Sequence, residues 1–121
     1  MPAKLTTHVL DLARGRPAAG MRVELWRLDP EPRLLKSAAT NADGRTDAPL
    51  LEGAQMAAGA YEIVFLAGDY FAGNAAPGES AAAGGRFLDR IPVRFSLAEA
   101  GASCHVPLLV TPWGYTTYRG S

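Results

Sequence analysis

The chain has 121 residues, which is enough for one domain with a single hydrophobic core. Hydrophobic residues make up 48% of it and charged residues 20%, as in ordinary globular proteins. The 12 basic residues balance the 12 acidic residues, so the chain has no net positive charge with which to attract nucleic acid or an anionic membrane. We therefore expect one domain over residues 1–121, without nucleic acid or a membrane as a partner.

The cysteine content and the two ends of the sequence bear on its location. Cys104 is the single cysteine, so no intramolecular disulfide can form, which fits a reducing compartment. Residues 1–8 lack the basic and apolar regions of a signal peptide, and no apolar run approaches the roughly 20 residues that span a bilayer. Residues 119–121 are unlike a peroxisomal signal of the Ser-Lys-Leu type. These features predict a cytoplasmic protein.

Short segments bounded by turn residues make up the first half of the chain. Residues 5–10 form a β-prone run, and residues 21–28 begin with an alternation of apolar and polar side chains that marks a strand with one buried face. Residues 33–39 follow a proline-containing turn and are expected to form a partner strand. The turn Asn41–Gly44 favours a positive φ at its glycine, and it places Arg45 where the turn becomes extended chain.

The second half adds more strands and one short helix. Residues 61–66 predict an apolar strand, and residues 69–74 predict a helix with Asp69 as its N-cap and Gly73 at its end. Residues 75–85, rich in alanine and glycine, predict a loop. Further strands are expected over residues 90–95, 105–111 and 115–118. About seven or eight short strands with one small helix predict an all-β fold, an antiparallel β-sandwich.

Several common kinds of site find no support in the sequence. No glycine-rich segment continues into the Gly-Lys-Ser/Thr of a phosphate-binding loop, and no Gly-x-Ser-x-Gly nucleophile motif is present. His8, Cys104 and His105 are the only soft metal ligands, and they lack metal-site spacing, so no metal is expected. Cys104 and His105 are neighbours, so in a strand they point to opposite faces, which argues against a Cys–His nucleophile pair.

The two histidines are the most informative polar residues. His8 and His105 each lie in an apolar, β-prone run, where an imidazole must find a hydrogen-bond partner or line a wet cavity. A lone histidine of this kind is more often structural than catalytic. The first and seventh strands of a sandwich can nevertheless lie close in space, within one protomer or across an oligomer. Two histidines converging with Arg45 would combine a general base with an anion-binding group.

Four separate motifs, in the correct order, resemble those of the 5-hydroxyisourate hydrolase family. Leu-Thr-Thr-His-Val-Leu-Asp, continued by Ala-Arg-Gly-Arg-Pro-Ala, resembles the opening motif of the family. A second segment resembles its arginine-bearing turn, and two further segments resemble its two closing motifs. They lie at residues 5–11 with 13–18, 40–47, 105–109 and 112–121. The terminal Tyr-Arg-Gly-Ser is the most discriminating, because the related transthyretins, which carry hormones, lack that tetrapeptide.

The resemblance implies a fold, a reaction and an assembly. The fold would be the transthyretin-like β-sandwich. The activity would be that of a cyclic amide hydrolase, converting 5-hydroxyisourate to 2-oxo-4-hydroxy-4-carboxy-5-ureidoimidazoline in urate (purine) catabolism, without a cofactor. The family works as a homotetramer, a dimer of dimers, with its sites in the channel where two dimers meet.

The resemblance also implies roles for particular residues. His8, Arg45 and His105 would occupy the catalytic positions, with Ser121 as a further one. His8, Arg45 and Tyr118 would contact the substrate. Either histidine could be the base that activates water, while Arg45 would stabilise developing negative charge.

One position departs from the family pattern. Members often have a second histidine two residues before the one in the His-Val-Pro motif, and this chain has Ser103 there. Strand alternation would put Ser103 on the same face as His105. The channel would then lose one imidazole, which bears on rate or pH dependence.

Two other classes of protein remain as alternatives. A non-enzymatic, transthyretin-like carrier of small ligands would use the same central channel, but it predicts apolar or long flexible residues at positions 8 and 105 and no Tyr-Arg-Gly-Ser end. A purely structural or adhesive sandwich would leave the four motifs unexplained.

Overall fold

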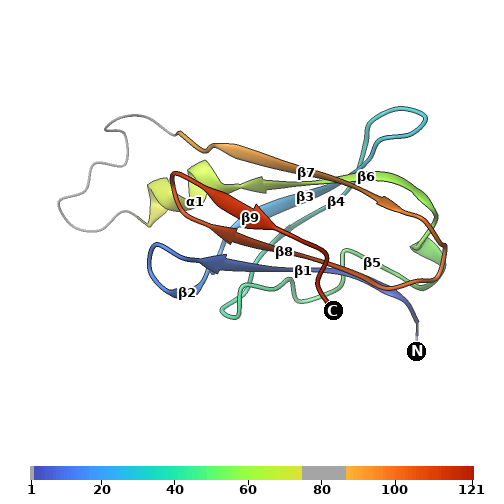
Figure 1. The fold of residues 1–121 in the computed structure, drawn as a ribbon, viewed down its shortest axis with the longest axis horizontal. Coiled ribbons are helices and arrows are strands. Elements are labelled where there is room, and N and C mark those ends of the chain that lie inside the picture. Colours follow the sequence, from blue (N-terminus) through green and yellow to red (C-terminus); the bar gives the residue numbers. More distant parts are fainter. Residues whose placement is uncertain (1, 75–86) are drawn as a thin grey trace.

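The structure, a computed structural model, describes residues 2–74 and 87–121. In this part of the chain two β-sheets pack face to face, and one short helix lies at one end of the sandwich (Figure 1). The predicted β-sandwich with one short helix is confirmed. The loop expected over residues 75–85 lies outside the described residues.

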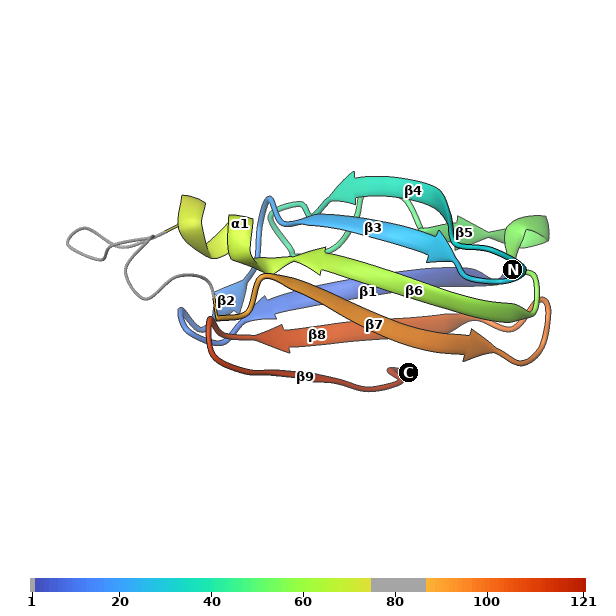
Figure 2. The same cartoon turned by 90° about the horizontal axis from the view of Figure 1, so that it is seen from above.

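The described residues form nine strands in two sheets, seen one behind the other in Figure 2. The five-stranded sheet contains β1 (Lys4–Asp11), β2 (Arg16–Pro17), β5 (Leu51–Glu52), β8 (Cys104–Val110) and β9 (Tyr115–Thr117). The four-stranded sheet contains β3 (Arg22–Arg27), β4 (Arg33–Ala39), β6 (Gly59–Leu66) and β7 (Arg90–Leu97). A 3-10 turn, η1 (Gly53–Gln55), and a helix, α1 (Ala67–Gly73), complete the fold. The sequence did not predict the two-residue strands β2 and β5.

One pair of strands departs from the expected antiparallel pattern. The sheet orders are β2-β1-β8-β9, with β5 also on β1, and β4-β3-β6-β7. β1 and β8 run parallel, with Leu5 opposite Cys104 and Asp11 opposite Val110, whereas all the other pairs of these named strands are antiparallel. A hairpin cannot connect two parallel strands, so no local turn signal in the sequence predicts this pairing.

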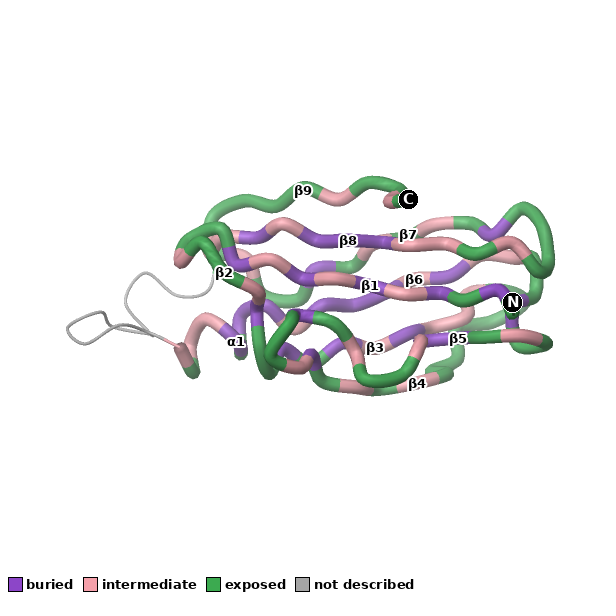
Figure 3. Tube along the Cα trace, turned by 90° about the horizontal axis from the view of Figure 1, so that it is seen from below, coloured by how far each residue is buried: buried purple, intermediate pink, exposed green. Residues whose placement is uncertain are grey.

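The core lies between the sheets, and β1 shows how the sequence divides core from surface. Leu5 and Val9 are fully buried, whereas Thr6 and His8 are half-buried on the opposite face. This period of two is the alternation expected of a strand with one face on a core. Figure 3 shows the same change between buried and intermediate positions along β1. The outer face of the five-stranded sheet therefore carries polar side chains from β1.

The helix begins two residues earlier than the sequence predicts. α1 starts at Ala67, directly after β6, and its N-cap is Leu66, so the prediction of Asp69 as N-cap is wrong. The predicted end at Gly73 is confirmed. The start of the helix follows from burial, because Ala67 and Tyr70 face the core. The Tyr70 hydroxyl also donates a 2.8 Å hydrogen bond to the buried Asp11 carboxylate. Burial, and then this hydrogen bond, raise the pKa of Tyr70 to about 12.

The turn that precedes Arg45 depends on a glycine for two reasons. Gly44 has φ +78°, in the left-handed region that favours glycine. A Cβ atom at Gly44 would also lie 2.3 Å from the Val9 carbonyl oxygen. The Gly44 carbonyl in turn accepts a 2.8 Å hydrogen bond from the Val9 N–H, so the turn lies directly against β1.

We expect Gly44→Ala to lower the free energy of unfolding by about 2 kcal/mol or more, since it combines backbone strain with an overlap. The matched control is Gly20→Ala, because Gly20 has φ +81° but nothing within 4 Å of the added methyl. Chemical denaturation of both variants measures the difference. Equal destabilisation of the two would show that the close approach to Val9 contributes nothing.

Candidate active site

The parallel pairing of β1 and β8 brings the two histidines to one surface. Thr6 lies opposite His105, and His8 lies opposite Pro107. His8 and His105 are therefore on adjacent strands, offset by two positions, and both belong to the outer face of the five-stranded sheet. The expectation that the strands carrying the two histidines lie close together is confirmed.

Arg45 joins this surface from the other side of β1. It forms an isolated antiparallel bridge with His8. The Asn41 side-chain oxygen accepts hydrogen bonds from the backbone N–H groups of Asp43, at 2.9 Å, and of Arg45, at 3.2 Å. The Asn41 N–H donates to the Arg45 carbonyl at 2.7 Å. The turn thus fixes the backbone of Arg45 beside the first histidine.

The C-terminal segment adds Tyr118 to the same face. Leu108 lies opposite Thr117 in β9, and His105 forms an antiparallel bridge with Gly120. This register places Tyr118 opposite Pro107, so Tyr118 lies on the same face of the sheet as the histidines. Tyr118 is 57% exposed. The sheet therefore brings together the positions predicted as functional at 8, 45, 105 and 118.

Ser121 follows directly on the residue that pairs with His105. The Gly120 N–H donates a 2.8 Å hydrogen bond to the His105 carbonyl. This bond holds the chain at the sheet one residue before Ser121, which is exposed. The role of Ser121 stays a prediction.

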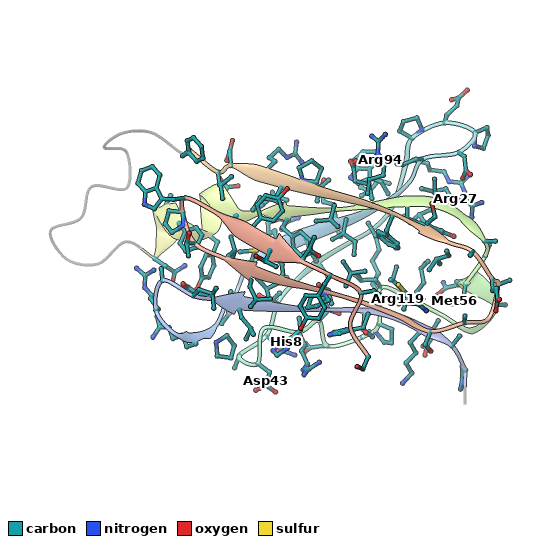
Figure 4. All side chains as sticks on the ribbon, viewed as in Figure 1. His8, Arg27, Asp43, Met56, Arg94 and Arg119 are labelled. Atoms are coloured by element: carbon teal, nitrogen blue, oxygen red, sulfur yellow. The ribbon has the colours of Figure 1, made fainter. Side chains whose placement is uncertain are left out.

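His8 is anchored through its ring. Its Nε2 lies 2.8 Å from the Asp43 carbonyl oxygen, and Figure 4 shows the two residues side by side. A carbonyl oxygen can only accept a hydrogen bond, so Nε2 carries the hydrogen and is the donor. In the neutral ring, Nδ1 is then the unprotonated nitrogen.

His105 is held by a residue that the sequence analysis missed. Its Nδ1 lies 2.8 Å from the Thr6 hydroxyl oxygen. Because Thr6 is two residues before His8 in a strand, the period of two already puts both on one face, and this signal could have identified Thr6. Both histidines thus find the hydrogen-bond partners that their apolar surroundings require.

The surroundings of His105 favour the neutral form of its ring. Burial lowers the pKa of His105 from its ordinary 6.5, the positive charge of Arg45 lowers it further, and His8 adds a smaller effect of the same sign. A hydrogen bond with the backbone of Thr6 partly opposes them. His105 therefore remains able to accept a proton at lower pH than an exposed histidine.

Cys104 lies on the other face of β8. Its side chain packs against the core, as the alternation with His105 predicts. Burial raises the pKa of the Cys104 thiol, and the charge of Arg119 opposes this only in part. A protonated, inward-facing thiol is a poor nucleophile. The prediction that Cys104 and His105 form no nucleophilic pair is consistent with this arrangement.

Ser103 precedes the strand whose alternation predicted that it shares a face with His105. β8 begins at Cys104. The Ser103 hydroxyl accepts a 3.0 Å hydrogen bond from the Lys4 N–H, which ties it to the start of β1. The effect of a serine at this position stays a prediction.

The groups gathered on the outer face suit proton transfer and the binding of a flat, electron-rich molecule, since they are two imidazoles, a guanidinium and a phenol. Within residues 2–74 and 87–121, no three His, Cys, Asp or Glu side chains are grouped so that they could share a metal ion. In the same residues, no helix has the length and apolar character to cross a membrane.

We expect Arg45→Gln to raise the pKa of His105, because a nearby cation disfavours the protonated ring. The pKa should stay below 6.5, since burial, the larger cause, remains. An NMR titration of the imidazole signals measures it, with Arg22→Gln on β3 of the other sheet as the control. An unchanged or lower pKa in Arg45→Gln would show that the two groups are not coupled.

Comparison with known proteins places this site in a family. The family model described as "HIUase/Transthyretin family" matches residues 5–120. A 5-hydroxyisourate hydrolase of Mesorhizobium japonicum is 56% identical over 98% of this chain and 92% of that protein. A second relative, a 5-hydroxyisourate hydrolase of Deinococcus radiodurans, is 51% identical over 97% of this chain and 95% of its own length.

Solved structures agree with the sequence comparison. An (S)-allantoin synthase is 43% identical with a TM-score of 0.89 over 99% of this chain, which spans only 44% of that longer protein. The Klebsiella pneumoniae 5-hydroxyisourate hydrolase is 35% identical with a TM-score of 0.76, over 98% of this chain and 99% of its own. Transthyretin from Sparus aurata shares the fold at 22% identity, with a TM-score of 0.82 over 98% of this chain and 97% of its own. The chain therefore belongs to the HIUase/transthyretin family.

Proposed function

We propose that this protein hydrolyses 5-hydroxyisourate to 2-oxo-4-hydroxy-4-carboxy-5-ureidoimidazoline, a step in the breakdown of urate. The observation that carries the proposal is the gathering of His8, Arg45 and His105 on one sheet face. The relatives with the highest identity reported above are named 5-hydroxyisourate hydrolases, and they match nearly the whole chain. The likeness to transthyretin concerns the fold alone, and no feature of the site favours a carrier.

The proposed chemistry is the hydrolysis of a cyclic amide. The oxygen of water attacks the ring carbonyl carbon, and one proton of that water passes to an imidazole. The carbon–nitrogen bond of the ring then breaks, and the departing nitrogen receives a proton. Either His8 or His105 supplies the imidazole, because a neutral imidazole accepts a proton near neutral pH.

Arg45 and the C-terminal residues are assigned the remaining roles. Arg45 offers a planar set of N–H donors to the oxyanion that forms at the attacked carbonyl. Tyr118, exposed and on the histidine face, offers a hydroxyl to the substrate ring. Ser121 is proposed as a further catalytic residue, on the strength of the family resemblance.

We also propose that the protein is a homotetramer, a dimer of dimers. β7 and β9 end the two sheets on the same side of the sandwich, and a groove of about 430 Å³ opens there, lined by residues of both strands and of β8. Unpaired strand edges are ready to pair with another chain. Large aromatic side chains, Trp113 and Tyr115, are exposed next to these edges. A second contact between dimers would enclose the histidine face in a channel.

Two broader assignments complete the proposal. We place the enzyme in the cytoplasm, which suits a chain with one cysteine that is free in this structure. We also treat residues 1–121 as one domain, since the described residues form a single sandwich around one core.

Replacing His8 or His105 by Asn, or Arg45 by Gln, should each lower kcat by about a hundredfold or more, the scale expected for a base or an oxyanion donor. The assay follows by ultraviolet absorbance the decay of 5-hydroxyisourate generated by urate oxidase. Arg22→Gln, on the other sheet, is the control and should keep full activity. A wild-type protein that is folded but leaves the spontaneous decay rate unchanged would disprove the hydrolase assignment.

Tyr115→Glu should convert the tetramer to smaller species, because it places a charge where the second copy is expected to cover β9. Tyr115 is 45% exposed in the single chain, so the folded protomer should tolerate the change. The matched control is Leu35→Glu, at a 37% exposed position of β4 on the opposite edge. Light scattering measures the mass; a fully active wild-type monomer at assay concentration would contradict the proposed assembly.

A further inference from the structure

We propose that Thr6 and Gly120 are positioning residues that hold the His105 ring in one orientation and one tautomer, with Nδ1 protonated and the Nε2 lone pair free to take a proton from water. The proposal rests on the hydrolase function proposed above. It assigns the base to His105, and it adds two residues that act through that ring.

Thr6 holds the ring at Nδ1. The two residues lie directly opposite each other in the parallel ladder, and the Thr6 hydroxyl oxygen is 2.8 Å from Nδ1. The contact is partly buried, so water competes poorly for either atom. Because the hydroxyl can either donate or accept, this bond fixes which nitrogen is engaged but not which group carries the hydrogen.

The direction of the bond follows from the role proposed for His105. Nδ1 faces the Thr6 hydroxyl and Cδ2 lies against Gly120, so Nε2 is the ring nitrogen left to reach a water molecule. A base needs its lone pair on the nitrogen that meets the water, so the hydrogen of the neutral ring must lie on the other nitrogen. We therefore assign the hydrogen to Nδ1, with the Thr6 hydroxyl as its acceptor. In the neutral ring this leaves Nε2 with a free lone pair.

Gly120 supports the opposite part of the ring. A Cβ atom at Gly120 would lie 2.4 Å from Cδ2 of His105 and 3.2 Å from Cγ. Gly120 is absent from the described glycines with a positive φ, so its backbone conformation does not require glycine. The space taken by the imidazole does require it. The hydrogen bond from the Gly120 N–H to the His105 carbonyl keeps the two backbones at this separation.

His8 is held through the other ring nitrogen, and this difference distinguishes the roles of the two histidines. Its Nε2 donates to the Asp43 carbonyl, so the outer nitrogen of that ring is already engaged. In His105 the engaged nitrogen is Nδ1, and Cδ2 lies against Gly120. The outer nitrogen, Nε2, is therefore the free base in His105 alone.

The test uses conservative changes at Thr6. Thr6→Val removes the hydroxyl but keeps a β-branched side chain, and Thr6→Ser restores the hydroxyl. The matched control is Thr7→Val, since the Thr7 hydroxyl donates a 2.7 Å hydrogen bond to the Val106 carbonyl. That control removes one hydroxyl bond between the same two strands, on the opposite face from His105.

The direct readout is the ¹⁵N shift of each ring nitrogen in the intact, assembled protein. The chain has two histidines, so His8→Gln assigns both sets of signals. In the wild type, we expect neutral His105 with Nδ1 protonated and neutral His8 with Nε2 protonated. Thr6→Val should move His105 toward the Nε2-protonated form, Thr6→Ser should return it, and Thr7→Val should leave it unchanged.

Kinetics give the second readout. Thr6→Val should lower kcat about tenfold, a part of what the base contributes, with little change in KM. Gly120→Ala should do the same, because the added methyl displaces the ring. Since both changes act on one ring, the double variant should lose less than the product of the single losses.

The two readouts separate this inference from the hydrolase assignment. If Thr6→Val and Gly120→Ala keep the wild-type tautomer and kcat, the positioning role is wrong while the enzyme assignment stands. An Nε2-protonated His105 in the wild type also overturns the proposal. If the wild type lacks hydrolase activity, the proposed function fails, and the ¹⁵N shifts still decide whether Thr6 and Gly120 hold the ring.

Discussion

The parallel ladder between β1 and β8 is the contact on which the rest of the structure depends. It joins residues about 100 positions apart and unites the two ends of the described chain in one sheet. On its inner face the Thr7 hydroxyl donates to the Val106 carbonyl, and on its outer face the Thr6 hydroxyl meets His105. The same backbone pairing therefore closes the core and assembles the site. A change that weakens the ladder should disturb both together.

The site brings the imidazole of His105 near the permanent positive charge of Arg45, and the surroundings favour the neutral imidazole beside that charge. The guanidinium of Arg45 disfavours a second positive charge on His105, and burial acts in the same direction. Both effects lower the pKa of His105 and so favour its neutral ring. The cation that favours this form is also the group that can stabilise an oxyanion, so one charge serves both the resting state and the reaction.

Local patterns in the sequence predicted most of the fold, and they failed where distant residues decide the outcome. The division of the chain into short segments by turn residues, with alternation as a further signal in β3, located β3, β4, β6 and β7 to within two residues at each end. It missed the start of α1, because a buried hydrogen bond between Tyr70 and Asp11, 59 positions away, outweighs the capping preference of Asp69. The parallel pairing was out of reach for the same reason. His8, His105 and Arg45 stood out from their sequence context, whereas their catalytic roles and the choice of Tyr118 and Ser121 came from the family resemblance. Alternation alone could have added Thr6.

Strand register explains why the fold and the site cannot vary independently. Along β1, Thr6 faces the site and Thr7 faces the core, and along β8 His105 and Cys104 divide in the same way. A slip of one residue in either strand would exchange these faces. It would bury an imidazole among apolar side chains and expose the core residues to water. The apolar positions that stabilise the sandwich therefore also select the register that faces His105 toward its proposed substrate.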